Sequence, residues 1–262
     1  MKIQPLVVCA LLFFFFGCAP RGEKAAESEK ETEMGGISFQ ASDGTKVYAV
    51  LYPVTEGANA PIVLLFHQAR SNSGEYEPIA KRLVSMGINA LAVDLRSGGE
   101  MWGRKNKTAE AFRTDPGYLA AYRDMEAALD WAKKQGYSKI AVMGSSYSAS
   151  LALRLAAEHP EISAVMAFSP GEYGELKGQV RGWNEKVEVP VLFACTKDEL
   201  REVRAYYDTP KKKLLRSKYD LLISEEEGVH GASTLREDKN PDGYKFYWAG
   251  LEGFLEQWKK GF

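Results

Sequence analysis

The chain has 262 residues, of which 45% are hydrophobic and 26% are charged, and its formal net charge is -1. This balance excludes an intrinsically disordered chain and provides enough apolar material for a sizeable core. The near-neutral charge gives no electrostatic reason to expect a nucleic-acid partner.

The beginning of the chain is typical of an export signal. A lysine precedes an apolar run over residues 6–16, which is too short to span a bilayer as a helix and fits the hydrophobic part of a secretory signal. A small residue followed by Cys18 resembles a bacterial lipobox, although Phe15 stands where that motif usually has Leu. The resemblance implies that residues 1–17 are a lipoprotein signal peptide and that Cys18 carries the lipid. A plainly secreted protein and an uncleaved anchor are the alternatives.

Residues 18–35 are expected to be the lipidated cysteine and a flexible tether, because they are polar, mixed in charge and free of aromatic side chains. Residues 36–262 are predicted to form a single domain, which the lipid alone would attach to the membrane of the cell envelope. Cys9 lies inside the signal, and Cys195 lies in an apolar run as a small buried hydrophobe. The cysteines therefore predict no internal disulfide and no zinc site, and no cofactor is implied.

From residue 36 the apolar residues follow a pattern of alternating strands and helices. Alternation around Asp43-Gly44 predicts a β-hairpin. Continuous apolar runs predict six further strands, at 61–67, 88–95, 138–144, 162–170, 189–196 and 218–225. Apolar residues at helical spacing predict helices at 75–87, 119–137, 148–159 and 243–260. The expected fold is α/β: a mostly parallel eight-stranded sheet with an antiparallel start and helices on both faces. In such sheets, sites form at the carboxyl ends of the strands.

The segment "VMGSSYSAS" joins one predicted strand to the helix that follows it. Its frame from Gly144 to Ser148 resembles the Gly-x-Ser-x-Gly nucleophile elbow of the α/β-hydrolases, with Ser148 in place of the second glycine. The resemblance implies that Ser146 is the nucleophile and that the backbone N–H of Tyr147 is one donor to the oxyanion. A small-residue turn that only allows close packing is the alternative.

A serine hydroxyl is a weak nucleophile and needs a base and an orienting acid. The order of the α/β-hydrolase superfamily is serine, acid, histidine, and this order implies His230 as the base, since it follows the last predicted strand. The acid is expected after the strand at 189–196, where we favour Asp198. Glu199, and Glu172 and Glu175 after the preceding strand, are the alternatives.

The segment "HQARSNSGEY" after the strand at 61–67 resembles the His-Gly oxyanion loop of the superfamily. Gln68 occupies the glycine position, and its backbone N–H is the expected second oxyanion donor. The non-glycine residue suggests a branch similar to the dienelactone hydrolases rather than the lipases. His67 either supports the loop or is a core histidine, and His159 is interpreted as a residue at the carboxyl end of a helix.

Two segments, 97–116 and 170–189, are predicted to be loops that overhang the site. They either form a partial lid for an apolar or anionic substrate or are ordinary exposed loops. They carry aromatic and cationic residues that suit such a role, among them Trp102, Arg104, Lys105, Lys107, Arg113, Tyr173, Arg181 and Trp183. The segment "DLRSGGE" at 94–100 is interpreted as structural.

Together these features predict a serine hydrolase that cleaves carboxylic esters of small molecules through a Ser-His-Asp triad and an acyl-enzyme. A peptidase or amidase with the same triad, and a non-catalytic binding lipoprotein on a hydrolase scaffold, are the alternatives.

Overall fold

The computed structural model describes residue 1 and residues 35–209, 219–223 and 228–262. The predicted signal peptide beyond Met1, the lipidation residue Cys18 and almost all of the predicted tether lie outside the described residues. From Gly35 onward, the described chain belongs to one compact unit.

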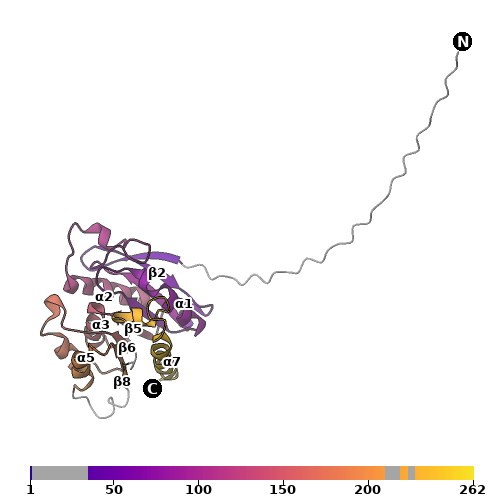
Figure 1. Ribbon diagram of the computed structural model, residues 1–262. Helices are drawn as coiled ribbons and strands as arrows, with labels where there is room; N and C mark the ends of the chain where they lie inside the picture. The colour runs from indigo at the N-terminus through magenta and orange to yellow at the C-terminus, as the bar shows by residue number, and fades with distance from the viewer. Residues whose placement is uncertain (2–34, 210–218, 224–227) are drawn as a thin grey trace. The chain divides into compact units, whose positions relative to one another are not determined.

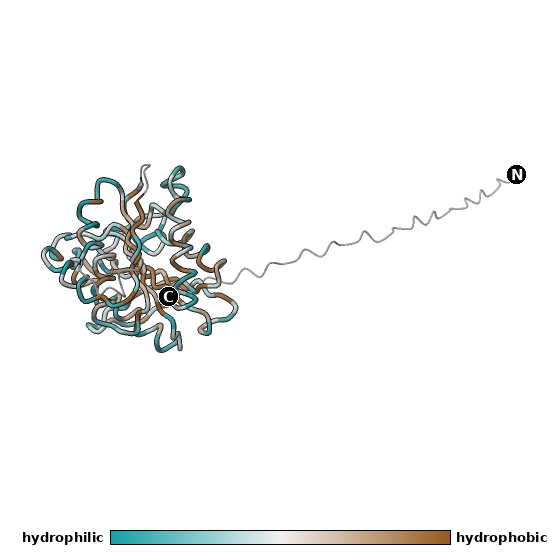
Figure 2. Tube along the Cα trace, turned by 90° about the horizontal axis from the view of Figure 1, so that it is seen from below, coloured by the Kyte–Doolittle hydropathy of each residue, from teal (hydrophilic) through white to brown (hydrophobic). Residues whose placement is uncertain are grey.

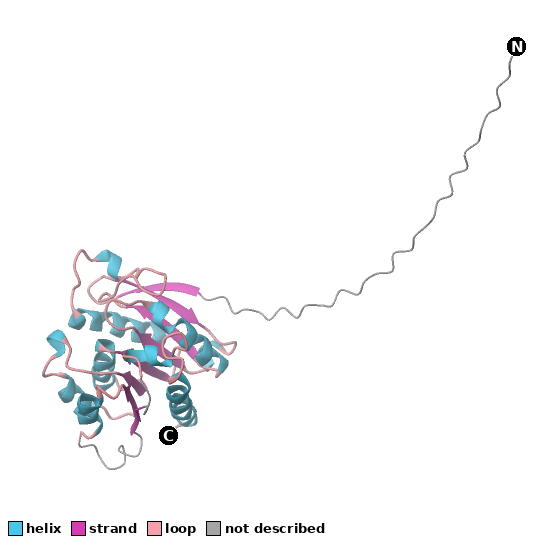
Figure 3. Ribbon diagram, in the orientation of Figure 1, coloured by secondary structure: helices cyan, strands magenta, loops and turns pink. Residues whose placement is uncertain are grey.

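The unit is built on one eight-stranded sheet. Its strands are β1 (Gly35–Gln40), β2 (Lys46–Tyr52), β3 (Ile62–Phe66), β4 (Asn89–Asp94), β5 (Ile140–Ser145), β6 (Ile162–Phe168), β7 (Val191–Cys195) and β8 (Tyr219–Ile223). Their order in the sheet is β1-β2-β4-β3-β5-β6-β7-β8. β1 pairs antiparallel with β2 and β2 pairs antiparallel with β4, whereas every other neighbouring pair is parallel. The predicted mostly parallel sheet with an antiparallel start is therefore confirmed, and its strands are the magenta arrows of Figure 3.

Helices cover both faces of the sheet, and the pleat of the strands decides which side chains meet which helices. The helices are α1 (Glu77–Ser85), α2 (Tyr118–Lys134), α3 (Tyr147–Glu158), α4 (Val180–Lys186), α5 (Leu200–Tyr207) and α7 (Tyr244–Lys260). In β3, Ile62, Leu64 and Phe66 pack into one core with α2 and α3, while Val63 and Leu65 pack into a second core with α1 and α7. Figure 1 shows α2, α3 and α5 on one side of the strands and α1 and α7 on the other. In Figure 2 the hydrophobic stretches accordingly lie inside the described unit.

The segment 170–189 differs from its predicted loop, because it contains the short helix α4 and a 3-10 turn at Gly174–Leu176. Val180 and Asn184 of α4 are buried, and the Asn184 side-chain amide donates to the carbonyl of Tyr206 at 2.8 Å. Two buried positions in seven residues are too few to stand out as a helical period. The segment 97–116 holds a 3-10 turn at Ala109–Ala111 and a single β-bridge, and is otherwise irregular.

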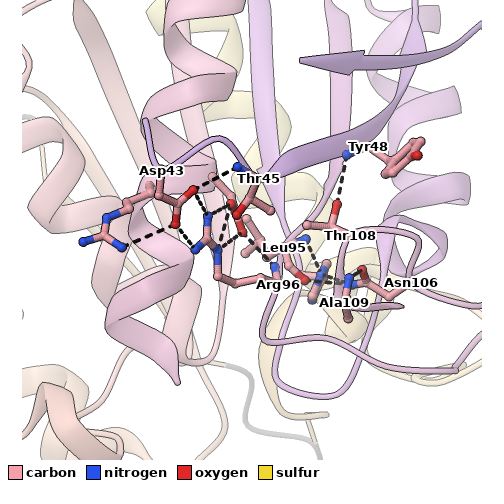
Figure 4. Close-up of polar contacts among 11 residues, drawn as sticks. Asp43, Thr45, Tyr48, Leu95, Arg96, Asn106, Thr108 and Ala109 are labelled. Carbon is pink, nitrogen blue, oxygen red and sulfur yellow. Dashed lines mark hydrogen bonds and ion pairs between the residues drawn. The ribbon is translucent and has the colours of Figure 1, made fainter. Parts of the chain in front are cut away.

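A buried ion cluster fastens the β1–β2 turn to the body of the fold (Figure 4). The Arg96 side chain is 2% exposed and lies 2.7 Å from Asp124 in α2 and 2.5 Å from Asp43 in the turn. Asp43 also accepts the backbone N–H of Thr45 at 3.1 Å. Arg96 therefore links three segments that are far apart in sequence, and the hydrogen bonds from its guanidinium hold the pKa of Asp43 well below its usual range. Within the described ranges, no helix is long and apolar enough to cross a membrane.

Candidate active site

Ser146 lies at a sharp turn between the end of β5 and the start of α3. Its backbone has φ 61° and ψ -125°, a conformation that is strained for a residue with a Cβ. Its backbone N–H donates to Phe168 of β6 at 2.9 Å, and the residue is 7% exposed. The strained serine at the carboxyl end of a central parallel strand is the geometry expected of a nucleophile elbow.

The neighbours of Ser146 explain why small residues are required at this turn. A Cβ on Gly144 would lie 2.4 Å from the carbonyl oxygen of Ser148 and 2.5 Å from the Cα of Ala149, so strand and helix meet without room for a side chain. The Ser148 hydroxyl lies 2.6 Å from the carbonyl of Phe66 in β3 and accepts the backbone N–H of Ser145 at 2.9 Å. Ser148 therefore holds the elbow against β3, a role that glycine does not provide.

His230 begins a 3-10 turn, Gly231–Leu235, that follows β8, and its imidazole is paired with Glu199. The Nδ1 of His230 hydrogen-bonds Glu199 Oε1, while Oε2 of the same carboxylate accepts the Ser169 hydroxyl at 2.6 Å and the Thr196 N–H at 3.1 Å. Burial on its own raises the pKa of Glu199, but the hydrogen bonds from His230, Ser169 and Thr196 lower it to about 2. Glu199 is therefore a stable carboxylate that orients the imidazole.

The prediction that Asp198 is the acid partner is wrong. Asp198 is exposed, and the described part of the chain makes no hydrogen bond or ion pair with its carboxylate. The chain turns after β7, with the Glu199 N–H donating to the Thr196 carbonyl at 3.3 Å, so Asp198 points outward and Glu199 folds back. The sequence from Thr196 to Glu199 has a Thr-x-x-Glu pattern, and the glutamate accepts the threonine N–H as it would in a capping box, although α5 begins only after Glu199. This pattern is the sequence signal that favours Glu199 over Asp198.

Tyr173 contacts both Ser146 and His230. Its ring stands edge-on to the His230 ring with 6.3 Å between centroids, and its hydroxyl donates to the carbonyl of Ser169 at 2.8 Å. Burial raises the pKa of Tyr173, and a hydrogen bond from Ser146 opposes that rise. In the described residues, the Ser146 hydroxyl thus approaches Tyr173 and makes no hydrogen bond with His230. In the absence of substrate, the hydrogen bond between a catalytic serine and its base is often long or poorly aligned.

The two predicted oxyanion donors have different outcomes. The N–H of Tyr147 is the first of α3 and has no acceptor in the helix, so it is available to an oxyanion beside Ser146. The Gln68 N–H is not available, because it donates to Glu75 Oε2 at 2.9 Å, and this part of the prediction is corrected. The backbone N–H of the next residue, Ala69, has no hydrogen-bond acceptor among residues 35–209, 219–223 and 228–262. Ala69 is therefore the better candidate for the second donor.

The other two histidines have partners other than Glu199 and Ser146. His67 is fully buried, hydrogen-bonds the Gln68 carbonyl through Nδ1 at 2.7 Å, and accepts the Leu95 N–H at 2.9 Å and the Asn106 amide at 3.1 Å through Nε2. Burial lowers its pKa, so the ring is a neutral brace for the loop after β3. His159 follows the carboxyl end of α3 and lies 3.6 Å from Glu126.

The tryptophans of the two predicted overhanging segments are held elsewhere. Trp102 donates to the Ser71 hydroxyl at 2.8 Å, and its ring is covered by Arg236 at 4.1 Å from the centroid. Trp183 lies under Arg154 of α3, 5.5 Å away. Of Trp102, Tyr173 and Trp183, only Tyr173 contacts Ser146 and His230 among the described residues.

The structure also bears on metal binding and on the thiol of Cys195. Within the part of the chain that the structure describes, there is no group of three or more His, Cys, Asp and Glu side chains placed to hold a metal ion. Cys195 is buried and free, and burial raises its pKa to about 12, so its thiol is inert.

Comparison with known proteins shows the family and the fold of the chain. Residues 48–234 match the model of the dienelactone hydrolase family. The fold is similar to the Pyrococcus furiosus esterase Pf2001, with 18% identity over 87% of this chain and 91% of that one and a TM-score of 0.65. It is also similar to a dienelactone hydrolase from Anabaena variabilis (15% identity, 86% and 97% of the two chains, TM-score 0.66). Est1E from Butyrivibrio proteoclasticus gives 16% identity, 86% and 98% coverage and a TM-score of 0.65. A search of curated protein sequences finds no match.

The family match spans Gln68, Ser146, Glu199 and His230, and the three structures share the fold. The chain therefore belongs to the dienelactone hydrolase family of the α/β-hydrolase superfamily, and it is a hydrolase.

Proposed function

We propose that this protein is a serine hydrolase that cleaves carboxylic esters through Ser146, His230 and Glu199. The observation that carries the proposal is the His230–Glu199 hydrogen bond beside the strained elbow at Ser146. A neutral histidine whose Nδ1–H is held by a carboxylate presents an unprotonated Nε2, which is the base that a serine requires. Membership of the dienelactone hydrolase family supports the ester as the substrate class.

The geometry supports a two-step reaction. In the first step the Ser146 hydroxyl turns from Tyr173 to His230, its oxygen attacks the ester carbonyl, and Nε2 takes the proton. The Tyr147 N–H lies at the first position of α3, where it stabilises the oxyanion that develops. His230 then protonates the alcohol that leaves, and an acyl-enzyme remains on Ser146. In the second step His230 takes a proton from water and the resulting hydroxide attacks the acyl carbonyl. The bond to Ser146 then breaks, His230 returns the proton to the Ser146 oxygen, and the carboxylic acid departs.

We also propose that the protein is attached to the cell envelope by a lipid on Cys18. The support is the sequence: an apolar run with a small residue before the cysteine, followed by a polar tether. Radiolabelled palmitate should enter the wild-type protein and not the Cys18→Ser variant. Equal labelling of the two would refute the lipid anchor without affecting the hydrolase proposal.

The hydrolase proposal is tested with p-nitrophenyl esters of increasing acyl length beside aminoacyl anilides. We expect ester cleavage that Ser146→Ala abolishes and that the exposed control Ser85→Ala leaves unchanged. Hydrolysis of the anilides with comparable kcat/KM would assign the site to amide chemistry. Absence of turnover on both panels, with no covalent labelling by a fluorophosphonate, would favour a binding protein on a hydrolase scaffold.

A further inference from the structure

Glu75 is a fully buried carboxyl group that the proposed reaction does not use. It lies in the 3-10 turn Ser73–Tyr76 between β3 and α1, with no exposed surface. A buried carboxylate is costly unless it is hydrogen-bonded or paired. Burial raises the pKa of Glu75, whereas hydrogen bonds from Gln68, Ser145 and Ser71 and the nearby charge of Arg236 lower it. Its hydrogen-bond partners therefore compensate for its burial.

The partners of Glu75 belong to the segments that form the candidate active site. Oε2 accepts the Gln68 N–H at 2.9 Å and the Ser71 hydroxyl at 3.2 Å in the loop after β3. Oε1 accepts the hydroxyl of Ser145, the residue before the nucleophile, at 2.7 Å. The Ser145 oxygen in turn accepts the N–H of Ala232, two residues after His230, at 2.9 Å. One carboxylate therefore links the oxyanion loop, the elbow and the histidine segment.

The bonds to the loop fix two successive peptide planes. Glu75 holds the N–H of Gln68, while the Gln68 carbonyl is held by His67 Nδ1 at 2.7 Å and by the Ser71 N–H at 3.3 Å. In a trans peptide the carbonyl of one residue and the N–H of the next point in opposite directions. Since the Gln68 carbonyl is fixed, the direction of the Ala69 N–H is fixed as well. That N–H has no hydrogen-bond acceptor among the described residues.

We infer that Glu75 is a positioning residue. It directs the Ala69 N–H toward the oxyanion and, through Ser145, holds Ser146 in position relative to that N–H. The inference rests on the proposed serine hydrolase function. Glu75 contacts neither substrate nor reacting atoms, and it acts through Gln68 and Ser145. When the Glu75 carboxylate is replaced by an amide, the amide NH2 group cannot accept the Gln68 N–H or the Ser145 hydroxyl. The loop after β3 then shifts, and the Ala69 N–H no longer points at the oxyanion.

The experiment compares Glu75→Gln with Glu77→Gln, a partly exposed acid two residues later that pairs with Lys81 and Arg104. We expect kcat for a p-nitrophenyl ester to fall about 10- to 100-fold in Glu75→Gln, with KM within about threefold. The Ala69 donor stabilises the transition state and not the bound ester, so its displacement lowers kcat and leaves KM nearly unchanged. Affinity for a boronic acid that mimics the tetrahedral state should fall by a similar factor. Glu77→Gln should change neither constant.

A second variant covers the case in which Glu75→Gln does not fold. Ser145→Ala keeps the carboxylate and its bond to Gln68 but removes the link to the elbow and to Ala232, and we expect a roughly tenfold loss in kcat at constant KM. Unchanged kcat or unchanged boronate affinity in a folded variant would overturn the inference. If the wild-type protein still cleaves the ester and Ser146→Ala does not, the proposed hydrolase function stands even when the Glu75 inference fails. The failure of the inference is therefore distinguishable from the failure of the proposed function.

Discussion

The assignment of the acid can be tested by exchanging one carboxylate for an amide at two adjacent positions. Glu199→Gln keeps the size of the side chain that bonds His230, and Asp198→Asn changes its exposed neighbour. The amide introduced by Glu199→Gln has one oxygen and one NH2 group in place of the two carboxylate oxygens. The Oε2 position faces the Thr196 N–H, which can only donate, so the amide oxygen settles there and the NH2 group faces His230 Nδ1.

The magnitude follows from that orientation. An NH2 donor at Nδ1 stabilises the tautomer that carries its proton on Nε2, so the base facing Ser146 is lost. In triad enzymes this change lowers kcat by about 10⁴-fold, which corresponds to about 5.5 kcal/mol of barrier. We expect a loss of about 10³- to 10⁴-fold for Glu199→Gln, and a change within about twofold for Asp198→Asn.

The assay is steady-state hydrolysis of a p-nitrophenyl ester, with all variants measured at the same pH. Thermal unfolding of each variant is the control for folding. The pair of variants differs by one position in the chain, and only one of the two residues contacts His230 in the structure. Loss of activity in Asp198→Asn with activity retained in Glu199→Gln would refute the orientation of the turn after β7.

Three further predictions concern stability. The pKa of Glu199 is lowered from 4.5 to about 2, so its contribution to stability is complete above about pH 4.5 and is lost as the pH falls toward 2; the difference in unfolding free energy between wild type and Glu199→Gln should shrink over that range, and a constant difference would contradict this. Arg96→Met leaves Asp124 buried without its partner and should cost about 3–5 kcal/mol in denaturant unfolding, whereas a loss below about 1 kcal/mol would show that the cluster is dispensable. Gly144→Ala places a Cβ 2.4 Å from the Ser148 carbonyl and should cost about 1–3 kcal/mol with loss of esterase activity, and full activity would contradict the close approach at the elbow.

The fold was predictable because its signals are local in the chain. Residues 62–66 are all buried and read as a continuous apolar run, and Asp43-Gly44 marks the hairpin with Gly44 at φ 81°. Strand–helix alternation then leaves a parallel sheet as the expected arrangement. The helix α4 was missed because its buried positions are few and its sequence is rich in exposed polar residues.

The site was predictable only where a motif fixes the backbone. Ser146 sits at the strained turn that its small neighbours indicate, and His230 follows β8 and bonds a carboxylate. The identity of that carboxylate depends on how the chain turns after β7, which reverses the directions of two adjacent acids. The Gln68 amide is predicted as an oxyanion donor because Gln68 occupies the glycine position of a His-Gly loop. Nothing near Glu75 in the sequence shows that its carboxylate turns back and binds that amide.

The central claim is that Ser146 forms the covalent intermediate, and mass spectrometry after reaction with a fluorophosphonate tests it most directly. Trypsin releases residues 140–154 as one peptide, since Lys139 and Arg154 border it, and this peptide contains Ser145, Ser146, Ser148 and Ser150. We predict one adduct per chain, located by fragmentation on Ser146 and absent from Ser146→Ala. An adduct on another serine of this peptide, or undiminished labelling of Ser146→Ala, would contradict the account.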